Sequence, residues 1–252
     1  MNNIIFYIII FTIILLLGFG IYYYYYYYNA VIEEFAGDNL KNIKGFQKLS
    51  PVKFKYGFCP ITDGYRKPKV IKNLISKDLC KKIIEWGRPK MKDAEVIGYS
   101  KTDLKSRNNK TAWMPKDNPL SIPIIQKVEK LVKLPRKNFE EMQVAMYFPG
   151  MFFKHHTDQC KENNEPCNKE NKRGGLRLYN LLIYLNGGFG GGETEFNTLK
   201  LKFKPKPGDA ILFENLNTKM DQCHPYSEHG GLEVTSGEKW ICNFWVREDT
   251  FV

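Results

Sequence analysis

The sequence predicts an α+β domain in which helices precede a double-layered antiparallel sheet. Two segments before Pro135 carry apolar residues at helical spacing, whereas after Pro135 apolar and polar residues alternate in many short runs separated by Gly, Pro and Asn. A period near 3.6 indicates a helix with one buried face, and a period of two indicates a strand. Helices followed by many short strands favour an α+β fold with a jelly roll.

An uncharged segment opens the chain. The first 32 residues contain no charged side chain, and residues 4–28 are almost wholly Ile, Leu, Phe and Tyr. A helix rising about 1.5 Å per residue over such a length crosses a hydrocarbon core of about 30 Å. We therefore expect one transmembrane helix over residues 1–28, with Tyr22–Tyr28 at the membrane interface. A cleaved signal peptide is the alternative, but the apolar run is long and has no basic n-region.

Residues 29–66 have the composition of a polar tether, because they are rich in lysine, broken by Gly and Pro, and without a sustained period. The lysines that follow the apolar segment favour a cytosolic domain by the positive-inside tendency. However, Glu33, Glu34 and Asp38 lie closer to the segment. The charges alone leave the orientation open.

A folded domain is expected over residues 67–252. Ser76 can cap a first helix that Gly87 and Pro89 end. A second helix is expected after Ser121, with an apolar face formed by Ile124, Ile125, Val128, Leu131 and Val132. Strands are expected at Met142–Phe148, Arg177–Leu185, Leu199–Phe203, Ala210–Phe213, Gly231–Val234 and Trp240–Arg247.

A His-x-Asp triplet, His156 and Asp158, is the first candidate for chemistry. Side chains two residues apart on extended backbone point the same way, so one metal ion can contact both. Two histidines and one carboxylate on one face of a metal leave open positions, as in non-haem Fe(II) oxygenases. Taken alone, the triplet is a weak signal, and a third ligand must come from elsewhere in the chain.

Four ordered blocks place this triplet in a longer pattern. QVAMYFPGMFFKHHTD (143–158) is followed by RLYNLLIYLNGGFGGGETEF (177–196), PKPGDAILFEN (205–215) and HGGLEVTSGEKWICNFWVRE (229–248). Together they resemble the prolyl 4-hydroxylase family of Fe(II)- and 2-oxoglutarate-dependent dioxygenases, with a dioxygenase core at about 139–248. The resemblance implies a double-stranded β-helix with flanking N-terminal helices.

The resemblance also implies residue roles. His156, Asp158 and His229 would hold Fe(II), and Lys239 would pair with the far carboxylate of 2-oxoglutarate. The family's spacing of ten residues between the distal His and the Lys selects His229 over His224, while His155 is offset by three from Asp158. The resemblance also implies that Tyr147 and Thr194 donate hydrogen bonds to the cosubstrate and that Trp245 lines the pocket. Arg177 would either reach the substrate or brace the fold.

The implied activity is hydroxylation of peptidyl proline to 4-hydroxyproline, with L-ascorbate as reductant and a collagen-like protein as one candidate substrate. The alternatives are the same chemistry on lysine or on nucleic acid, and a membrane-tethered binding module without turnover. Nucleic-acid demethylases of this superfamily usually hold 2-oxoglutarate with arginine, so Lys239 disfavours them. The net charge of +11 is spread over scattered lysines and predicts no nucleic-acid platform. A composition rich in Lys, Asn, Ile and Tyr is typical of A+T-rich organisms and large DNA viruses.

Six cysteines are present in the chain. Cys160 and Cys167 flank a polar insert, and a disulfide between them is feasible if the domain lies in the lumen of the endoplasmic reticulum, the location that the family resemblance favours. A zinc site from Cys160, Cys167, Cys223 and His224 fits no standard spacing. The sequence leaves disulfide pairing and oligomeric state open.

Overall fold

The computed structural model describes residues 53–54, 57–58, 64–94, 106–159, 169–217 and 224–252. The predicted membrane segment, most of the tether and the insert between Cys160 and Cys167 lie outside these residues. Among the described helices, none has the length and apolar character needed to cross a bilayer.

The described domain is built on a seven-stranded antiparallel sheet. Its spatial order is β3 (Lys69–Ile71), β12 (Ala210–Glu214), β8 (Arg177–Tyr184), β15 (Lys239–Arg247), β6 (Met142–Tyr147), β5 (Lys110–Met114) and β4 (Lys92–Asp93). A four-stranded antiparallel sheet has the order β11 (Leu201–Phe203), β10 (Thr194–Phe196), β13 (His229–Gly231) and β7 (Phe153–His156). Two short pairs complete the strands: β1 (Lys53–Phe54) with β2 (Gly57–Phe58), and β14 (Val234–Ser236) with β9 (Gly190–Gly191).

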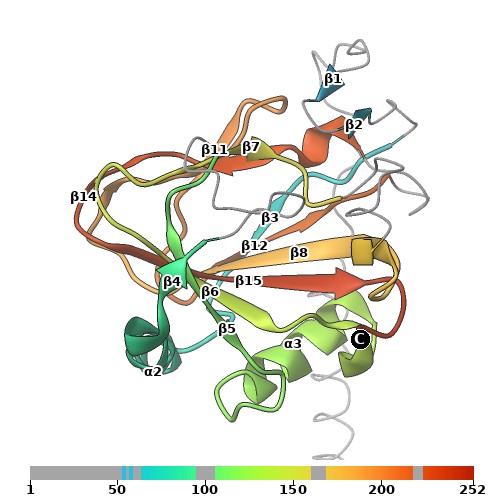
Figure 1. Cartoon of the computed structure of the whole chain (residues 1–252), viewed down its shortest axis with the longest axis horizontal. Coiled ribbons are helices and arrows are strands. Elements are labelled where there is room, and N and C mark those ends of the chain that lie inside the picture. Colours follow the sequence, from blue (N-terminus) through green and yellow to red (C-terminus); the bar gives the residue numbers. More distant parts are fainter. Residues whose placement is uncertain (1–52, 55–56, 59–63, 95–105, 160–168, 218–223) are drawn as a thin grey trace, which may run out of the picture. The chain divides into compact units, whose positions relative to one another are not determined.

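Two helices lie on one side of the large sheet, and β7 and β11 lie on the other side (Figure 1). Helix α2 (Lys77–Gly87) begins as predicted, because the Ser76 hydroxyl accepts a hydrogen bond from the Leu79 backbone N–H at 3.1 Å. Helix α3 (Ile122–Val132) buries Ile124, Ile125, Val128 and Val132. Three short 3-10 turns, η2 (Arg88–Lys90), η3 (Arg136–Asn138) and η4 (Pro225–Ser227), join the other elements.

The core fills the space between the two sheets. It contains Ala145, Tyr147, Leu182, Tyr184, Phe189, Phe196, Ile211, Phe213, Val234 and Ile241. The period-two pattern predicted this arrangement, since alternate residues of each strand face the core. The jelly-roll prediction therefore agrees with the two packed antiparallel sheets.

Two strand predictions need correction. The predicted strand Gly231–Val234 is wrong, because β13 ends at Gly231. The chain then turns into β14, where Val234 pairs with Gly191 of β9. Strand β11 begins at Leu201 rather than Leu199, because Lys200 adopts a positive φ of 54° in the turn that follows β10. Apolar alternation continues through such a turn and gives no sign of it.

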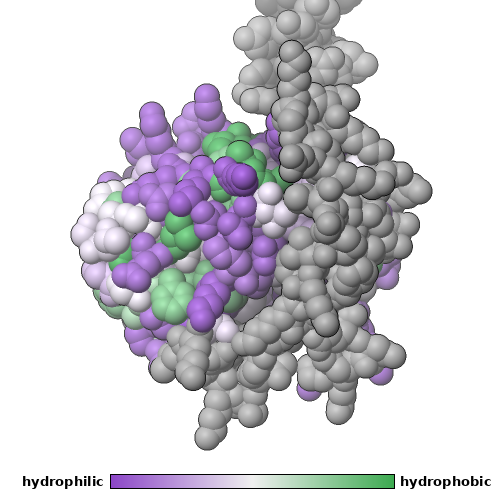
Figure 2. Space-filling view, turned by 90° about the horizontal axis from the view of Figure 1, so that it is seen from above, coloured by the Kyte–Doolittle hydropathy of each residue, from purple (hydrophilic) through white to green (hydrophobic). Residues whose placement is uncertain are grey.

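The packed domain includes Tyr65, which the sequence placed in the tether. Its side chain is 1% exposed, and its hydroxyl donates to the backbone carbonyl of Glu214 at 2.7 Å. On the face shown in Figure 2, hydrophilic side chains cover most of the described surface, and apolar residues show only in small areas between them.

Candidate active site

The pairing of β7 with β13 brings two histidines together. His156 is the last residue of β7 and His229 is the first residue of β13, and the two are directly opposite in register. Their ring centroids are 4.5 Å apart. The adjacent Gly230 permits this approach, because a Cβ there would lie 3.0 Å from the Phe153 carbonyl oxygen. Strand register, which joins residues 73 positions apart, therefore creates the histidine pair.

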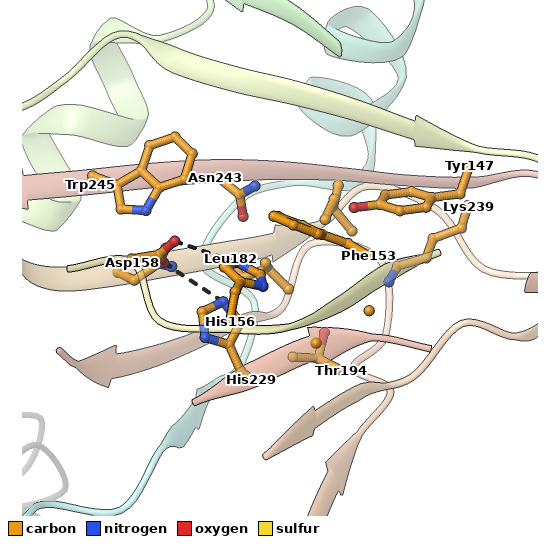
Figure 3. A pocket seen from close by; sticks show the side chains of 14 residues that line it. Tyr147, Phe153, His156, Asp158, Leu182, Thr194, His229, Lys239, Asn243 and Trp245 are labelled. Carbon is orange, nitrogen blue, oxygen red and sulfur yellow. Dashed lines mark hydrogen bonds and ion pairs between the residues drawn. The ribbon is translucent and has the colours of Figure 1, made fainter. Parts of the chain in front are cut away.

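Asp158 completes the cluster from the loop after β7. Its Oδ1 lies 3.5 Å from Nε2 of His156, and its Oδ2 lies 3.7 Å from Nε2 of His229. The Asn180 side-chain amide donates a hydrogen bond to Oδ2. Figure 3 shows the three side chains at one end of a pocket.

Backbone contacts orient both imidazoles. Nδ1 of His156 lies 2.8 Å from the Lys154 carbonyl oxygen, and Nδ1 of His229 lies 2.9 Å from that of Ser227. A carbonyl only accepts, so each Nδ1 is the donor and each Nε2 keeps its lone pair facing Asp158. Metal-binding histidines in proteins are usually held in this way.

The electrostatics also suit a cation. Burial, reinforced by the neighbouring His156, lowers the pKa of His229 to about 4, so its imidazole is neutral at pH 7. Burial opposes ionisation of Asp158, but His229, His156 and Arg177 outweigh it and hold the pKa of this carboxyl well below its usual range. One ligand atom from each of the three residues lies within 4.8 Å of the others. The set therefore offers two imidazole nitrogens and one carboxylate, the donors that Fe(II) accepts in a facial triad.

The rival histidines lie outside this cluster. Nε2 of His155 lies 2.8 Å from a carboxylate oxygen of Glu195. His224 is buried, and its ring packs 4.9 Å from that of Tyr65. Its Nδ1 accepts a hydrogen bond from the Tyr226 backbone N–H. Neither ring contributes to the group formed by His156, Asp158 and His229.

Lys239 occupies the opposite end of the pocket (Figure 3). The residue is 1% exposed, and no ion pair or hydrogen bond to its Nζ is found within the described part of the chain. Nζ lies 4.9 Å from the centre of the Tyr147 ring and 5.3 Å from that of Tyr184. Burial lowers the pKa of Lys239 to about 7. A buried ammonium without a counterion is a receptor for an anion.

Tyr147 and Thr194 also line the pocket, as predicted from the sequence. Tyr147 lies opposite Lys239 in the register of β6 with β15. The Thr194 hydroxyl and the Tyr184 hydroxyl share a hydrogen bond of 2.8 Å. Tyr184, which the sequence analysis did not single out, therefore fixes the Thr194 side chain.

Trp245 lines the pocket near Asp158 (Figure 3), whereas Arg177 is not among the residues that line it. The Arg177 guanidinium carbon is 4.4 Å from the centre of the Trp245 ring. Two Arg177 nitrogens donate to the Glu140 carboxylate at 2.6 and 2.8 Å, and Arg247 donates to the same carboxylate at 2.7 Å. Of the two roles considered for Arg177, these contacts match the bracing one.

Sequence reasoning missed Asn180 and Asn243, which line the pocket from β8 and β15. Both lie in otherwise apolar strands whose pattern predicts buried residues. A polar residue at a core position was the only signal that marked them.

The chain resembles known proteins over much of its length. A family model described as the 2OG-Fe(II) oxygenase superfamily matches residues 142–247. A protein of Acanthamoeba polyphaga mimivirus, assigned by name to the prolyl 4-hydroxylases, is 40% identical over 79% of this chain and 82% of its own length. Prolyl 4-hydroxylase 1 of Arabidopsis thaliana is 31% identical over 71% of this chain and 68% of its own length.

Among solved structures, the viral collagen prolyl hydroxylase of Paramecium Bursaria Chlorella virus-1, in its 2OG complex, is similar with a TM-score of 0.56. It is 31% identical in sequence and covers 71% of this chain and 94% of its own. The fold, the donor set and these similarities agree. The chain belongs to the prolyl 4-hydroxylase family within the 2OG-Fe(II) oxygenase superfamily.

Proposed function

We propose that this protein hydroxylates peptidyl proline to 4-hydroxyproline with Fe(II), 2-oxoglutarate and oxygen. The observation that carries the proposal is one pocket with two complementary ends: two histidines and a carboxylate at one end, and at the other the buried Lys239, which has no ion pair with any described residue. These two ends suit a short dicarboxylic acid by their charge, since one carboxylate can meet the ammonium while the other end reaches the metal.

In the proposed reaction, 2-oxoglutarate loses carbon dioxide and becomes succinate, which receives one oxygen atom of molecular oxygen. The second oxygen atom enters a C–H bond of the prolyl ring. His156, Asp158 and His229 would hold the iron, and the bound iron supplies the oxidising chemistry.

The protein's own residues do the positioning. Lys239 binds the far carboxylate of 2-oxoglutarate, with Tyr147 and Thr194 as hydrogen-bonding partners beside it. Asn180 holds the Asp158 carboxylate from behind, so that its other oxygen stays free for the metal. Trp245 forms the wall beside the reacting residue, and the ion pairs of Glu140 with Arg177 keep that wall in place.

The choice of proline, and of a collagen-like protein as its carrier, is supported by the names of the relatives. The chlorella virus protein of known structure is a collagen prolyl hydroxylase, and it is 31% identical to this chain. Prolyl 4-hydroxylase subunit alpha-1 of Homo sapiens is 26% identical over 80% of this chain. L-ascorbate is the expected reductant by the same analogy.

The proposed layout of the chain is a membrane anchor at 1–28, a tether at 29–66 and a catalytic domain at 67–252 that faces the lumen of the endoplasmic reticulum. The uncharged N-terminal run supports the anchor. In cells, the full chain should sediment with membranes, and protease should reach the domain only after detergent is added. Recovery of the full chain in the soluble fraction would refute the anchor.

The test of function is succinate release by the full-length chain in detergent, with Fe(II), ascorbate and 2-oxoglutarate, with and without (Pro-Pro-Gly)5. Peptide-stimulated turnover and a mass gain of one oxygen on proline are expected. Asp158→Ala and Lys239→Ala should lose both signals, whereas Lys130→Ala, on the exposed face of α3, should keep them.

Other outcomes discriminate the alternatives. Stimulation by a lysine peptide or by nucleic acid, with none by (Pro-Pro-Gly)5, would replace the substrate and keep the iron chemistry. Absence of iron binding and of succinate under every condition would leave a tethered binding module.

A further inference from the structure

Trp113 is a large aromatic residue that the fold leaves exposed. It lies on β5 with 47% of its surface accessible, and Val252 is the other large hydrophobic residue exposed among those the structure describes. Its strand neighbours Ala112 and Met114 are buried. Since side chains alternate along a strand, Trp113 projects from the opposite face of the sheet to these two residues.

That opposite face is the one that carries the pocket. Trp113 pairs with Gln143 of β6, and Gln143 pairs with Asn243 of β15, which lines the pocket. Directly paired residues lie on the same face of a sheet. The Trp113 ring centroid is 6.0 Å from that of Trp245, at an interplanar angle of 34°. An aromatic strip thus leads from the pocket wall to the exposed surface of β5.

The inner end of this strip has an unsatisfied hydrogen-bond donor. Nε1 of Trp245 is buried and has no hydrogen-bond partner among the described residues. An indole N–H can only donate, so its missing partner is an acceptor. Leaving such a group buried and unpaired is unfavourable, which is a reason to expect that a ligand supplies the acceptor. A peptide carbonyl is an acceptor of this kind.

We infer that Trp113 and Trp245 form a stacking strip that binds a proline-rich segment of the substrate in the polyproline II conformation, beside the residue that reacts. This inference rests on the proposed function. A polyproline II chain has no internal hydrogen bonds, so its carbonyls are available to Trp245. Aromatic-lined grooves bind such chains through their flat rings.

The geometry assigns different contacts to the two rings. Trp245 lines the pocket and meets the reacting residue or its carbonyl. Trp113 lies farther out on β5, and the 6.0 Å between ring centroids corresponds to about two residues at a polyproline II rise of about 3.1 Å each. Trp113 therefore contacts residues that flank the reaction site, and its contribution depends on peptide length.

The test compares the wild type with Trp113→Ala, using Ac-Gly-Pro-Pro-Gly-NH2 and (Pro-Pro-Gly)5 as substrates of the full-length chain. We expect the KM for the long peptide to rise about tenfold, as loss of one aromatic contact implies. The KM for the short peptide, the kcat at saturation and the peptide-independent turnover of 2-oxoglutarate should stay unchanged. Trp113→Phe should restore most of the affinity, and Trp86→Ala, on α2 at the other face of the sheet, is the matched control.

A second readout separates the failure of this inference from the failure of the proposed function. Peptide binding is measured by calorimetry with Mn(II) and 2-oxoglutarate in the absence of oxygen, so that no turnover is needed. Length-dependent binding that Trp113→Ala weakens supports the strip, even if no hydroxyproline forms, and in that case only the proposed reaction fails. Equal loss for both peptides, an unchanged KM for the long one, or no peptide binding by the wild type would overturn the inference.

Discussion

Binding of 2-oxoglutarate should depend on pH through Lys239, and Lys239→Arg should remove that dependence. Lys239 is buried without a counterion among the described residues, and burial lowers its pKa to about 7, with Glu193 opposing this effect and Lys204 reinforcing it. A carboxylate placed against the ammonium favours the protonated form and returns the pKa towards its ordinary value. Binding of 2-oxoglutarate above pH 7 must therefore take up a proton.

The magnitude follows from the two pKa values. Only the free enzyme with Lys239 protonated binds the cosubstrate well. The apparent Kd is therefore multiplied by the factor 1 + 10^(pH − pKa), in which the pKa is that of Lys239 in the free enzyme. With a pKa of about 7, the apparent Kd is ~2-fold weaker at pH 7, ~10-fold at pH 8 and ~100-fold at pH 9 than at low pH. Each further pH unit weakens the binding free energy of 2-oxoglutarate by about 1.4 kcal/mol. A bound metal cation would shift the pKa in the same direction as burial.

The assay is isothermal titration calorimetry of 2-oxoglutarate into the Mn(II)-loaded full-length chain between pH 7 and 9, without oxygen. Two buffers with different ionisation enthalpies report the proton uptake, which should approach one proton per site at about pH 8.5. Lys239→Arg keeps its charge over this range, so its Kd should be independent of pH whatever its absolute value. A wild-type Kd that stays flat between pH 7 and 9, or binding without proton uptake, would refute the reasoning.

Three further predictions concern the surroundings of the pocket. Asn180→Ala removes the amide that holds Asp158 and should weaken Mn(II) binding about 10- to 100-fold, measured by titration, while circular dichroism stays unchanged; undiminished binding would contradict this role. Glu140→Gln takes away the carboxylate shared by two buried guanidinium groups and should cost about 3–5 kcal/mol in urea unfolding; a loss below about 1 kcal/mol would show that the network adds little to stability. Cys80 and Cys242 are buried, and burial raises the pKa of Cys80 to about 11, so maleimide should label both thiols only when the protein unfolds. The labelled sites are read by peptide mass spectrometry, and labelling of either cysteine in the native protein would contradict this prediction.

Local patterns in the sequence determined the elements and part of the site. The period-two runs predicted β6, β8, β12 and β15 to within a residue or two, because each of these strands has a face towards the core. Ser76 marked the start of α2 because its hydroxyl caps the first turn. The His-x-Asp triplet was visible for the same reason, since both ligands lie on one short segment.

The tertiary structure decided what depends on contacts between distant segments. His229 becomes a partner of His156 through strand register, which local periodicity does not encode. Trp113 shows no local signal of function, and Asn180 shows only that of a polar residue in an apolar strand. The sheet places Trp113 beside Trp245 and Asn180 against Asp158. The sequence determined which residues could serve this chemistry, whereas the fold decided which of them meet, because long-range pairing sets the distances and burial on which binding depends.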